Sequence, residues 1–230
     1  PGLTLHKAAP RSGFFVPVPS TPMTSRLPPF DPRTVPVVAT GTDHDPRPAP
    51  HLFTADGLRQ LFERPPVWTP ELRQEPRFTD RAPARASVLL PLVVRDRISL
   101  LLTQRTAHLS THSGQIALPG GRIDPEDADA VAAALREADE EIGLTARHVE
   151  VPGTLPAYVT GTAFTVTPVV ALVRPGFELR PNPHEVADVF EVPLAFLMDP
   201  RHHRRHAFEF EGQRREWYSM PFDDGGQERF

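Results

Sequence analysis

Residues 136–144, which read Arg-Glu-Ala-Asp-Glu-Glu-Ile-Gly-Leu, are the most informative stretch of this 230-residue chain. The pattern over residues 127–142 predicts a helix, and Gly143 stands where a helix C-terminal cap is expected. At about 100° per residue, Glu137, Glu140 and Glu141 fall within one arc of that helix, and its apolar side chains cluster about 135° away. One side of the helix can therefore pack on a sheet while the other presents three carboxylates.

The acidic face is unfavourable by itself. Like charges three or four residues apart on a helix cost ~0.2–0.5 kcal/mol per pair. Asp139, Glu140 and Glu141 also occupy the last turn, where the helix dipole disfavours acids by ~0.3–1 kcal/mol each. A hard divalent cation such as Mg²⁺ takes oxygen ligands and would turn this penalty into a binding site. The pattern thus favours metal binding over the alternative, a solvated acidic face.

A glycine turn stands ahead of this helix, at Pro119-Gly120-Gly121. Glycine lets the backbone come close to a ligand, or turn its carbonyls and amides toward a metal and a phosphate. Such a turn is common by itself, so its weight comes from its position before the acidic helix.

The elements around this region intermix without regular alternation. A helix is expected over residues 54–64, and residues 86–94 and 98–104 read as a hairpin. Later runs predict strands over 149–160, 164–173, 187–192, 207–210 and 216–220, and a short helix over 193–198. This order predicts an α+β fold, with helices packed on a mixed β-sheet.

Composition excludes several classes of protein. Cysteine is absent, which removes disulfides, thiolate nucleophiles and cysteine-based metal sites. The most apolar stretch, residues 86–94, is far shorter than the ~20 residues that span a bilayer. Residues 51–230 carry 20 basic against 26 acidic side chains, the wrong sign for the basic footprint of a nucleic-acid binder.

The first 50 residues differ from the rest. They hold 12 of the 29 prolines and show neither helix nor strand periodicity, so we expect a mobile, disordered tail over 1–50 and a folded domain over 51–230. A transit peptide is the alternative, but the prolines spoil the amphipathic helix that such peptides need.

Residues 121–144 resemble the box of the Nudix hydrolases. That box runs Gly, five residues, Glu, seven residues, then Arg-Glu-apolar-x-Glu-Glu-x-Gly-apolar, and residues 136–144 fit its second half at every fixed position. Gly121 fits the leading glycine. The first half differs, because 14 residues rather than 13 separate Gly121 from Arg136, and Asp127 stands at the Glu position. The resemblance implies a Nudix-like α/β/α sandwich over residues 51–230.

A second set of motifs is similar to the coenzyme A pyrophosphatase subgroup of this family. It comprises residues 101–106, 108–109, 112–115 and 118–121, with later matches at 182–186 and 192–194. Thr106 and Leu118 stand where the subgroup has Ser and usually Phe. The resemblance implies hydrolysis of the diphosphate of coenzyme A, giving adenosine 3′,5′-bisphosphate and 4′-phosphopantetheine. Family members usually continue with another helix, so we expect this chain to lack a final C-terminal helix.

The resemblance also assigns roles to the acidic helix. We expect Glu137 and Glu141 to be the principal ligands of Mg²⁺ or Mn²⁺, with Glu140 as a further ligand or the general base. The Gly120 carbonyl completes the expected metal sphere. Arg136 is expected to orient these glutamates by charge-assisted hydrogen bonds.

Candidate substrate-binding residues lie before the helix. Arg105 is the best candidate for a phosphate clamp, because its guanidinium fork suits phosphate oxygens; a surface Arg at a strand end is the alternative. Ser113, Gln115 and Gly121 are weaker candidates. Glu185 is a candidate for a catalytic carboxylate from outside the box.

Two other functions stay open at this point. One is a Nudix enzyme for another nucleoside diphosphate derivative, such as ADP-ribose or a damaged nucleotide, and the other is a non-catalytic nucleotide-binding module. In each case the expected partner is a small molecule, without nucleic acid or membrane, in a cytoplasmic protein whose homodimerisation is left open.

Overall fold

The computed structural model describes residues 32–230 except 43, 68, 70–74, 76–78, 80, 108–113 and 211–212. Its helices are α1 (Ala55–Glu63), α2 (Ala130–Ile142) and α3 (Leu194–Leu197), with 3-10 turns at Pro32–Thr34, Pro50–Phe53, Ala146–His148 and Pro200–His202. Its strands are β1 (Val37–Thr40), β2 (Ala84–Val94), β3 (Ile98–Arg105), β4 (Ile116–Ala117), β5 (Gly120–Arg122), β6 (Val149–Thr154), β7 (Tyr158–Val159), β8 (Phe164–Val173), β9 (Val186–Pro193), β10 (Arg204–Phe210), β11 (Gln213–Ser219), β12 (Phe222–Asp224) and β13 (Gln227–Arg229).

The main sheet of the described residues has eight strands and is mixed. Its central path runs β4-β3-β2-β8-β6, and β5, β7 and β9 pair with β2, β8 and β3. β2 and β8 run parallel, whereas the other pairs are antiparallel. The predicted hairpin is present, since Leu92 pairs with Leu100 and Val94 with Ile98. The predicted strand over 149–160 is divided in two around Leu155–Ala157.

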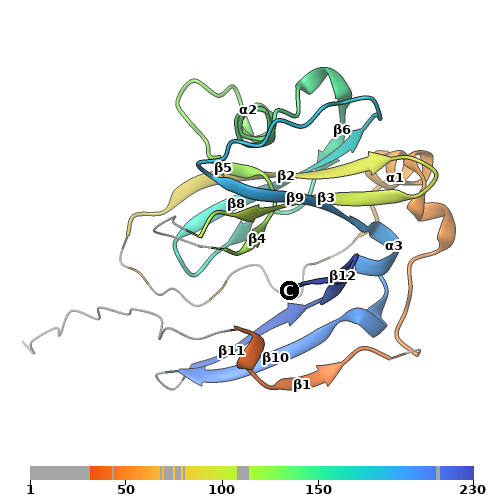
Figure 1. Cartoon of the computed structure of the whole chain (residues 1–230), viewed down its shortest axis with the longest axis vertical. Helices are drawn as coiled ribbons and strands as arrows, with labels where there is room; N and C mark the ends of the chain where they lie inside the picture. Colours follow the sequence, from red (N-terminus) through yellow and green to blue (C-terminus); the bar gives the residue numbers. More distant parts are fainter. Residues whose placement is uncertain are drawn as a thin grey trace, which may run out of the picture.

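Helices cover both faces of the main sheet. Leu89, Val93 and the odd-numbered apolar residues of β8 pack with α2 on one face. Leu92, Val170 and Leu172 pack on the other face with α1 and α3. Because successive strand side chains point to opposite faces, strands that are apolar throughout suit a sheet buried on both sides. The α+β fold predicted from sequence is confirmed as a three-layer arrangement (Figure 1).

Local contacts fix the ends of α2. Asp129 caps its N-terminus, where the side chain accepts a hydrogen bond from the Ala132 amide at 2.8 Å. Gly143 ends the helix in the left-handed conformation at φ 70°, as its sequence position predicted. The buried Ser87 hydroxyl donates to the Ala130 carbonyl at 2.6 Å, which ties the first turn of α2 to β2. These contacts set where the glutamates of α2 meet the sheet.

A second sheet lies on the side of the main sheet away from α2 (Figure 1). It has the order β1-β10-β11, and a separate hairpin, β12–β13, follows it. The expectation of a tail without secondary structure over residues 1–50 is wrong for residues 37–40, because β1 pairs antiparallel with β10. A strand of four residues is too short to show a clear alternation of apolar and polar side chains. Its partner strand β10 lies about 165 residues further along the chain, so the pairing leaves no local signal in the sequence. Residues 1–31 of the expected tail lie outside the described residues.

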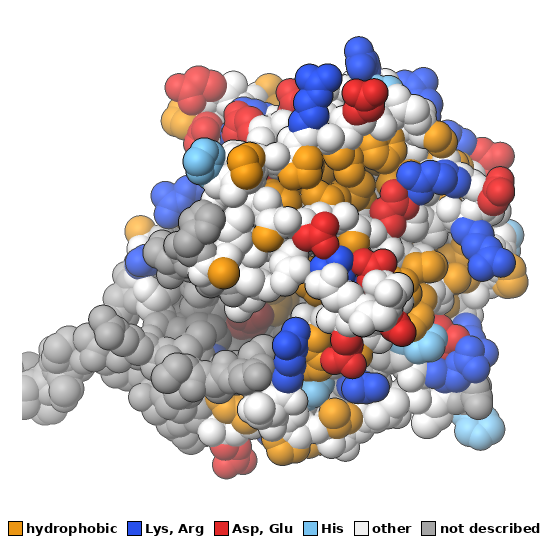
Figure 2. All heavy atoms as spheres, viewed as in Figure 1, with side chains coloured by type: hydrophobic (Ala, Val, Ile, Leu, Met, Phe, Trp, Pro, Cys, Tyr) orange, Lys and Arg blue, Asp and Glu red, His pale blue; other side chains and the backbone are white. Residues whose placement is uncertain are grey.

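The surface in Figure 2 carries acidic and basic side chains interspersed, rather than gathered by sign. None of the helices in the described residues has the length and apolar character that crossing a bilayer requires.

We expect Asp129→Ala to lower the free energy of unfolding by about 1 kcal/mol, because an N-cap side chain satisfies a helix amide that would otherwise lack a partner. Urea denaturation measures the change. Asp139→Ala is the matched control, since Asp139 is exposed in the last turn of the same helix. An equal loss in both variants would contradict the capping role.

Candidate active site

Glu141 is the buried acid of α2, with 5% of its surface exposed. Its Oε2 accepts a hydrogen bond from the Gly120 amide at 3.2 Å, and its Oε1 lies 3.8 Å from Nη1 of Arg105. Burial raises the pKa of Glu141 to about 7, and the charges of Glu137 and Glu185 add to this rise against the Gly120 hydrogen bond and Arg105. The Gly120 hydrogen bond and the Arg105 charge thus offset only part of the cost of burying the Glu141 carboxylate.

Glu137 lies one turn earlier and points to the same place. A Cβ atom built on Gly121 would lie 2.4 Å from Oε1 of Glu137 and 2.6 Å from Oε2, so any side chain at position 121 would displace this carboxylate. Burial raises the pKa of Glu137, and Arg136 opposes the rise. The glycine that the sequence motif requires therefore leaves room for a glutamate of the same motif.

Arg136 holds the outer part of the acidic face together. Its Nε and Nη2 donate to the two carboxylate oxygens of Asp127 at 3.0 and 2.9 Å. Its Nη1 donates to Glu137 at 3.0 Å and to Glu140 at 3.1 Å. The Arg136 guanidinium, followed by a backbone hydrogen bond from Asp124, lowers the pKa of Asp127. Asp127 thus anchors Arg136, an arrangement that sequence alone left undefined.

Glu140 differs from the other two glutamates. Its side chain is 60% exposed, and its contact with Arg136 turns it along the helix surface. The sequence placed three glutamates in one arc, but the structure brings only Glu137 and Glu141 against the glycine turn. The reason is that the sheet edge closes over one side of that arc and leaves the other side open to solvent.

Arg105 ends β3 on the face that carries α2. Its Nε is buried and has no hydrogen-bond partner among the described residues, while its Nη1 faces Glu141. A buried guanidinium nitrogen without a partner is costly unless a ligand supplies an acceptor. The Arg105 amide donates to the carbonyl of Gln115 at 2.9 Å, which brings the exposed Gln115 close to the strand end. Ser113 lies outside the described residues.

The loop before β9 closes the site on a third side. The Asn182 amide donates to the Glu141 carbonyl at 2.8 Å, and the Thr106 amide donates to the Glu185 carbonyl at 3.0 Å. The Thr106 hydroxyl donates to the His184 carbonyl at 3.2 Å. Glu185 lies near enough for its charge to add to the rise in the pKa values of Glu137 and Glu141. The Asn-Pro-His-Glu-Val motif was the only sequence signal for this loop.

The donor set suits a hard cation. In the part of the chain that the structure describes, no three histidine or carboxylate side chains converge closely enough to hold a metal as they stand. The buried Glu141 and the partly buried Glu137 beside the glycine turn, with Glu185 near both, still supply the oxygen donors that such a cation takes. Burial and, to a smaller extent, the neighbouring carboxylates raise both pKa values, and a cation here would offset both effects.

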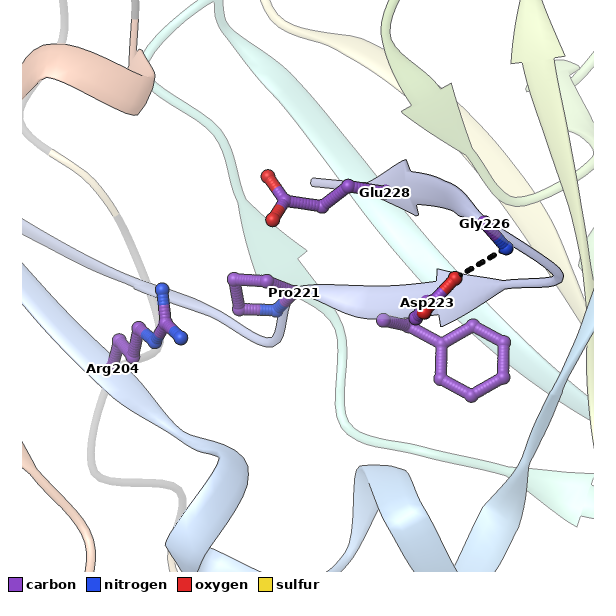
Figure 3. A pocket seen from close by; sticks show the side chains of 6 residues that line it. Arg204, Pro221, Asp223, Gly226 and Glu228 are labelled. Atoms are coloured by element: carbon purple, nitrogen blue, oxygen red, sulfur yellow. Dashed lines mark hydrogen bonds between the residues drawn. The ribbon is translucent and has the colours of Figure 1, made fainter.

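A separate hollow of about 250 Å³ lies beside the β12–β13 hairpin (Figure 3). Its lining combines an arginine with two acids and is formed by Arg204, Pro221, Phe222, Asp223, Gly226 and Glu228. None of the residues described above lines it, so it is distinct from the site at α2.

Comparison with known proteins identifies the family of this chain. The NUDIX domain family matches residues 83–217. The chain is 45% identical over 136 residues to the uncharacterized Nudix hydrolase NudL of Escherichia coli K12, which covers 59% of this chain and 71% of that protein. NudL of Salmonella paratyphi B matches equally well. The Ap4A hydrolase of Caenorhabditis elegans is a solved structure with 24% identity and a TM-score of 0.41, over 50% of this chain and 85% of that one. This chain belongs to the Nudix family.

The raised pKa of Glu141 predicts a pH-dependent stability. A carboxyl whose pKa is about 7 when folded and 4.5 when unfolded destabilises the fold as pH rises between these values. In chelator, we expect Glu141→Gln to gain about 1–3 kcal/mol over the unchanged protein between pH 4.5 and pH 8.5. Urea denaturation at both pH values measures it.

Asp139→Asn, on the exposed side of the same turn, is the control and should show a much smaller change. A pH-independent difference for Glu141→Gln would show that Glu141 is solvated rather than buried.

Proposed function

We propose that this protein hydrolyses the diphosphate of coenzyme A and its derivatives, with Mg²⁺ or Mn²⁺, giving adenosine 3′,5′-bisphosphate and 4′-phosphopantetheine. The observation that carries the proposal is the pair of carboxylates of the buried Glu141 and the partly buried Glu137, which lie against Gly120–Gly121, with Arg105 facing Glu141. The similarity of residues 101–121 to the coenzyme A subgroup supports the choice of substrate. Family membership supports hydrolysis of a nucleoside diphosphate derivative in general.

In this proposal, Glu137 and Glu141 hold the metal and the Gly120 carbonyl is a further oxygen donor, while Glu140 is either a further ligand or the general base. A bound divalent cation would neutralise the diphosphate and lower the pKa of the attacking water. Arg136, anchored by Asp127, fixes the Glu137 carboxylate by a charge-assisted hydrogen bond.

Arg105 binds a diphosphate oxygen through the nitrogens that face the site. Its partnerless Nε supports this role, because a phosphate oxygen would supply the missing acceptor. Gly121, Gln115 and Ser113 complete the substrate-binding side.

The proton of the attacking water passes to a carboxylate. Glu140 and Glu185 are the candidates, because the two glutamates that hold the metal cannot also accept it. The water oxygen forms a bond to one phosphorus of the diphosphate while the bond from that phosphorus to the bridging oxygen breaks. The bridging oxygen leaves with the other phosphorus, so both products end in a phosphate group.

The proposal is tested by mass spectrometry of the products formed from coenzyme A with and without Mg²⁺. We expect both named products in the presence of the metal and neither in its absence. ADP-ribose and oxidised nucleoside triphosphates are tested in parallel. Faster turnover of ADP-ribose than of coenzyme A would make ADP-ribose, rather than coenzyme A, the assigned substrate. No turnover of any compound would favour a nucleotide-binding module.

Glu141→Gln should lower kcat by at least about 100-fold, because it removes a charged metal ligand while keeping the acceptor for the Gly120 amide. Steady-state kinetics with coenzyme A measure the loss, and circular dichroism checks the fold. Asp139→Asn is the matched control and should keep turnover near that of the unchanged protein. Near-normal turnover in Glu141→Gln would contradict the ligand assignment.

A further inference from the structure

Arg229, in the last strand β13, is a buried guanidinium outside the site, with 6% of its side chain exposed. Its Nη2 donates to Asp188 at 2.5 Å and to Asp224 at 2.9 Å, and its Nη1 donates to the Gln104 side-chain oxygen at 2.9 Å. The guanidinium carbon lies 4.2 Å from the centre of the Phe190 ring. Charge-assisted hydrogen bonds are about twice as strong as neutral ones, so these contacts hold the Arg229 side chain firmly to its partners.

The contacts of Arg229 join the C-terminal hairpin to two neighbouring strands. Gln104 of β3 and Asp188 of β9 are Cα partners, so Arg229 bridges the two strands through side chains at one rung. The ladder becomes irregular at the next residue, where Arg105 pairs with Val186. Arg229 therefore acts at the last regular rung before Arg105.

This end of β3 is held by β9 and β4. β3 pairs with β2 only through residues 98–100, and further along the two strands separate. Beyond that point, β4 contributes two pairs to β3, and β9 is the other neighbour. The backbone bonds of Arg105 to Gln115 and of Thr106 to Glu185 continue these pairs, and Arg229 adds a side-chain cross-link at the point where the β3–β9 ladder shifts register.

The two ends of this connection lie on opposite faces of the sheet. Arg105 faces Glu141 of α2, whereas Gln104 faces Arg229 of the hairpin. Consecutive strand residues point to opposite faces, so the backbone at 104–105 transmits a shift on one face to the other. Thr106, the next residue, hydrogen-bonds to the loop that carries Glu185.

We propose that Arg229 is a positioning residue that holds the ends of β3 and β9 in the register at which Arg105 faces the substrate diphosphate. The inference rests on the proposed phosphate-binding role of Arg105. Arg229 does not touch the substrate; its effect is on where Arg105 and the 182–185 loop lie.

The test compares Arg229→Met, which removes the charge and the fork, with Arg229→Lys, which keeps the charge. Glu228→Gln is the control, because Glu228 is exposed on the same hairpin. Hydrogen exchange is followed at the amides of Arg105 and Thr106, which bond to the carbonyls of Gln115 and Glu185. We expect exchange at these amides to quicken about tenfold or more in Arg229→Met, less in Arg229→Lys, and not at all in Glu228→Gln.

Kinetics give the second readout. We expect Arg229→Met to raise KM about tenfold while kcat changes by less than about threefold, because Arg105 binds the diphosphate and the carboxylates of α2 stay in place. Exchange that quickens only within 222–230, or equally throughout α2, would overturn the proposal, since it would show a local anchor or a general loss of stability. Absence of turnover in the unchanged protein would contradict the proposed function, and exchange alone would then decide the role of Arg229.

Discussion

The burial of Glu141 in the last turn of α2 is the constraint on which the site depends. An acid at this end of a helix opposes the helix dipole, and removal from water adds a larger penalty. The structure supplies one amide, from Gly120, and a distant guanidinium, from Arg105. This compensation is incomplete, as the rise of the Glu141 pKa to about 7 records. The site is therefore arranged for a positively charged ligand, at a cost to the stability of the empty protein.

Two kinds of contact maintain this unfavourable arrangement. The apolar face of α2 packs on the sheet with Ala134, Ala138 and Ile142 fully buried, which fixes the height and rotation of the helix. Arg136 then distributes one positive charge over Asp127, Glu137 and Glu140. Asp127 carries a shorter side chain than the Glu of the family pattern, and the chain between Gly121 and Arg136 is one residue longer. With these two departures, Asp127 makes a bidentate contact with Arg136.

The second sheet and the C-terminal hairpin extend this organisation beyond α2. His206 is buried at 2% exposure between the Val35 carbonyl and the Ser219 hydroxyl, and it stacks on Trp217. The histidine-rich stretch at 202–206 is thus partly a structural element of the second sheet. On the other side, Arg229 joins the hairpin to β3 and β9. These contacts give the face away from α2 a defined connection to the strand end at Arg105.

Much of the fold and the family followed from sequence, because the signals are local. Periodicity and capping residues specify a helix within its own span, so α2, its glycine end and its acidic face could be predicted. Alternation and apolar runs likewise specified β2, β3 and β8. Only the tertiary structure decided which glutamates are buried, because that depends on how the sheet edge covers α2. It also decided that β1 joins β10, and that Arg229 reaches Gln104, since contacts between residues 125 or more positions apart leave no mark in either segment.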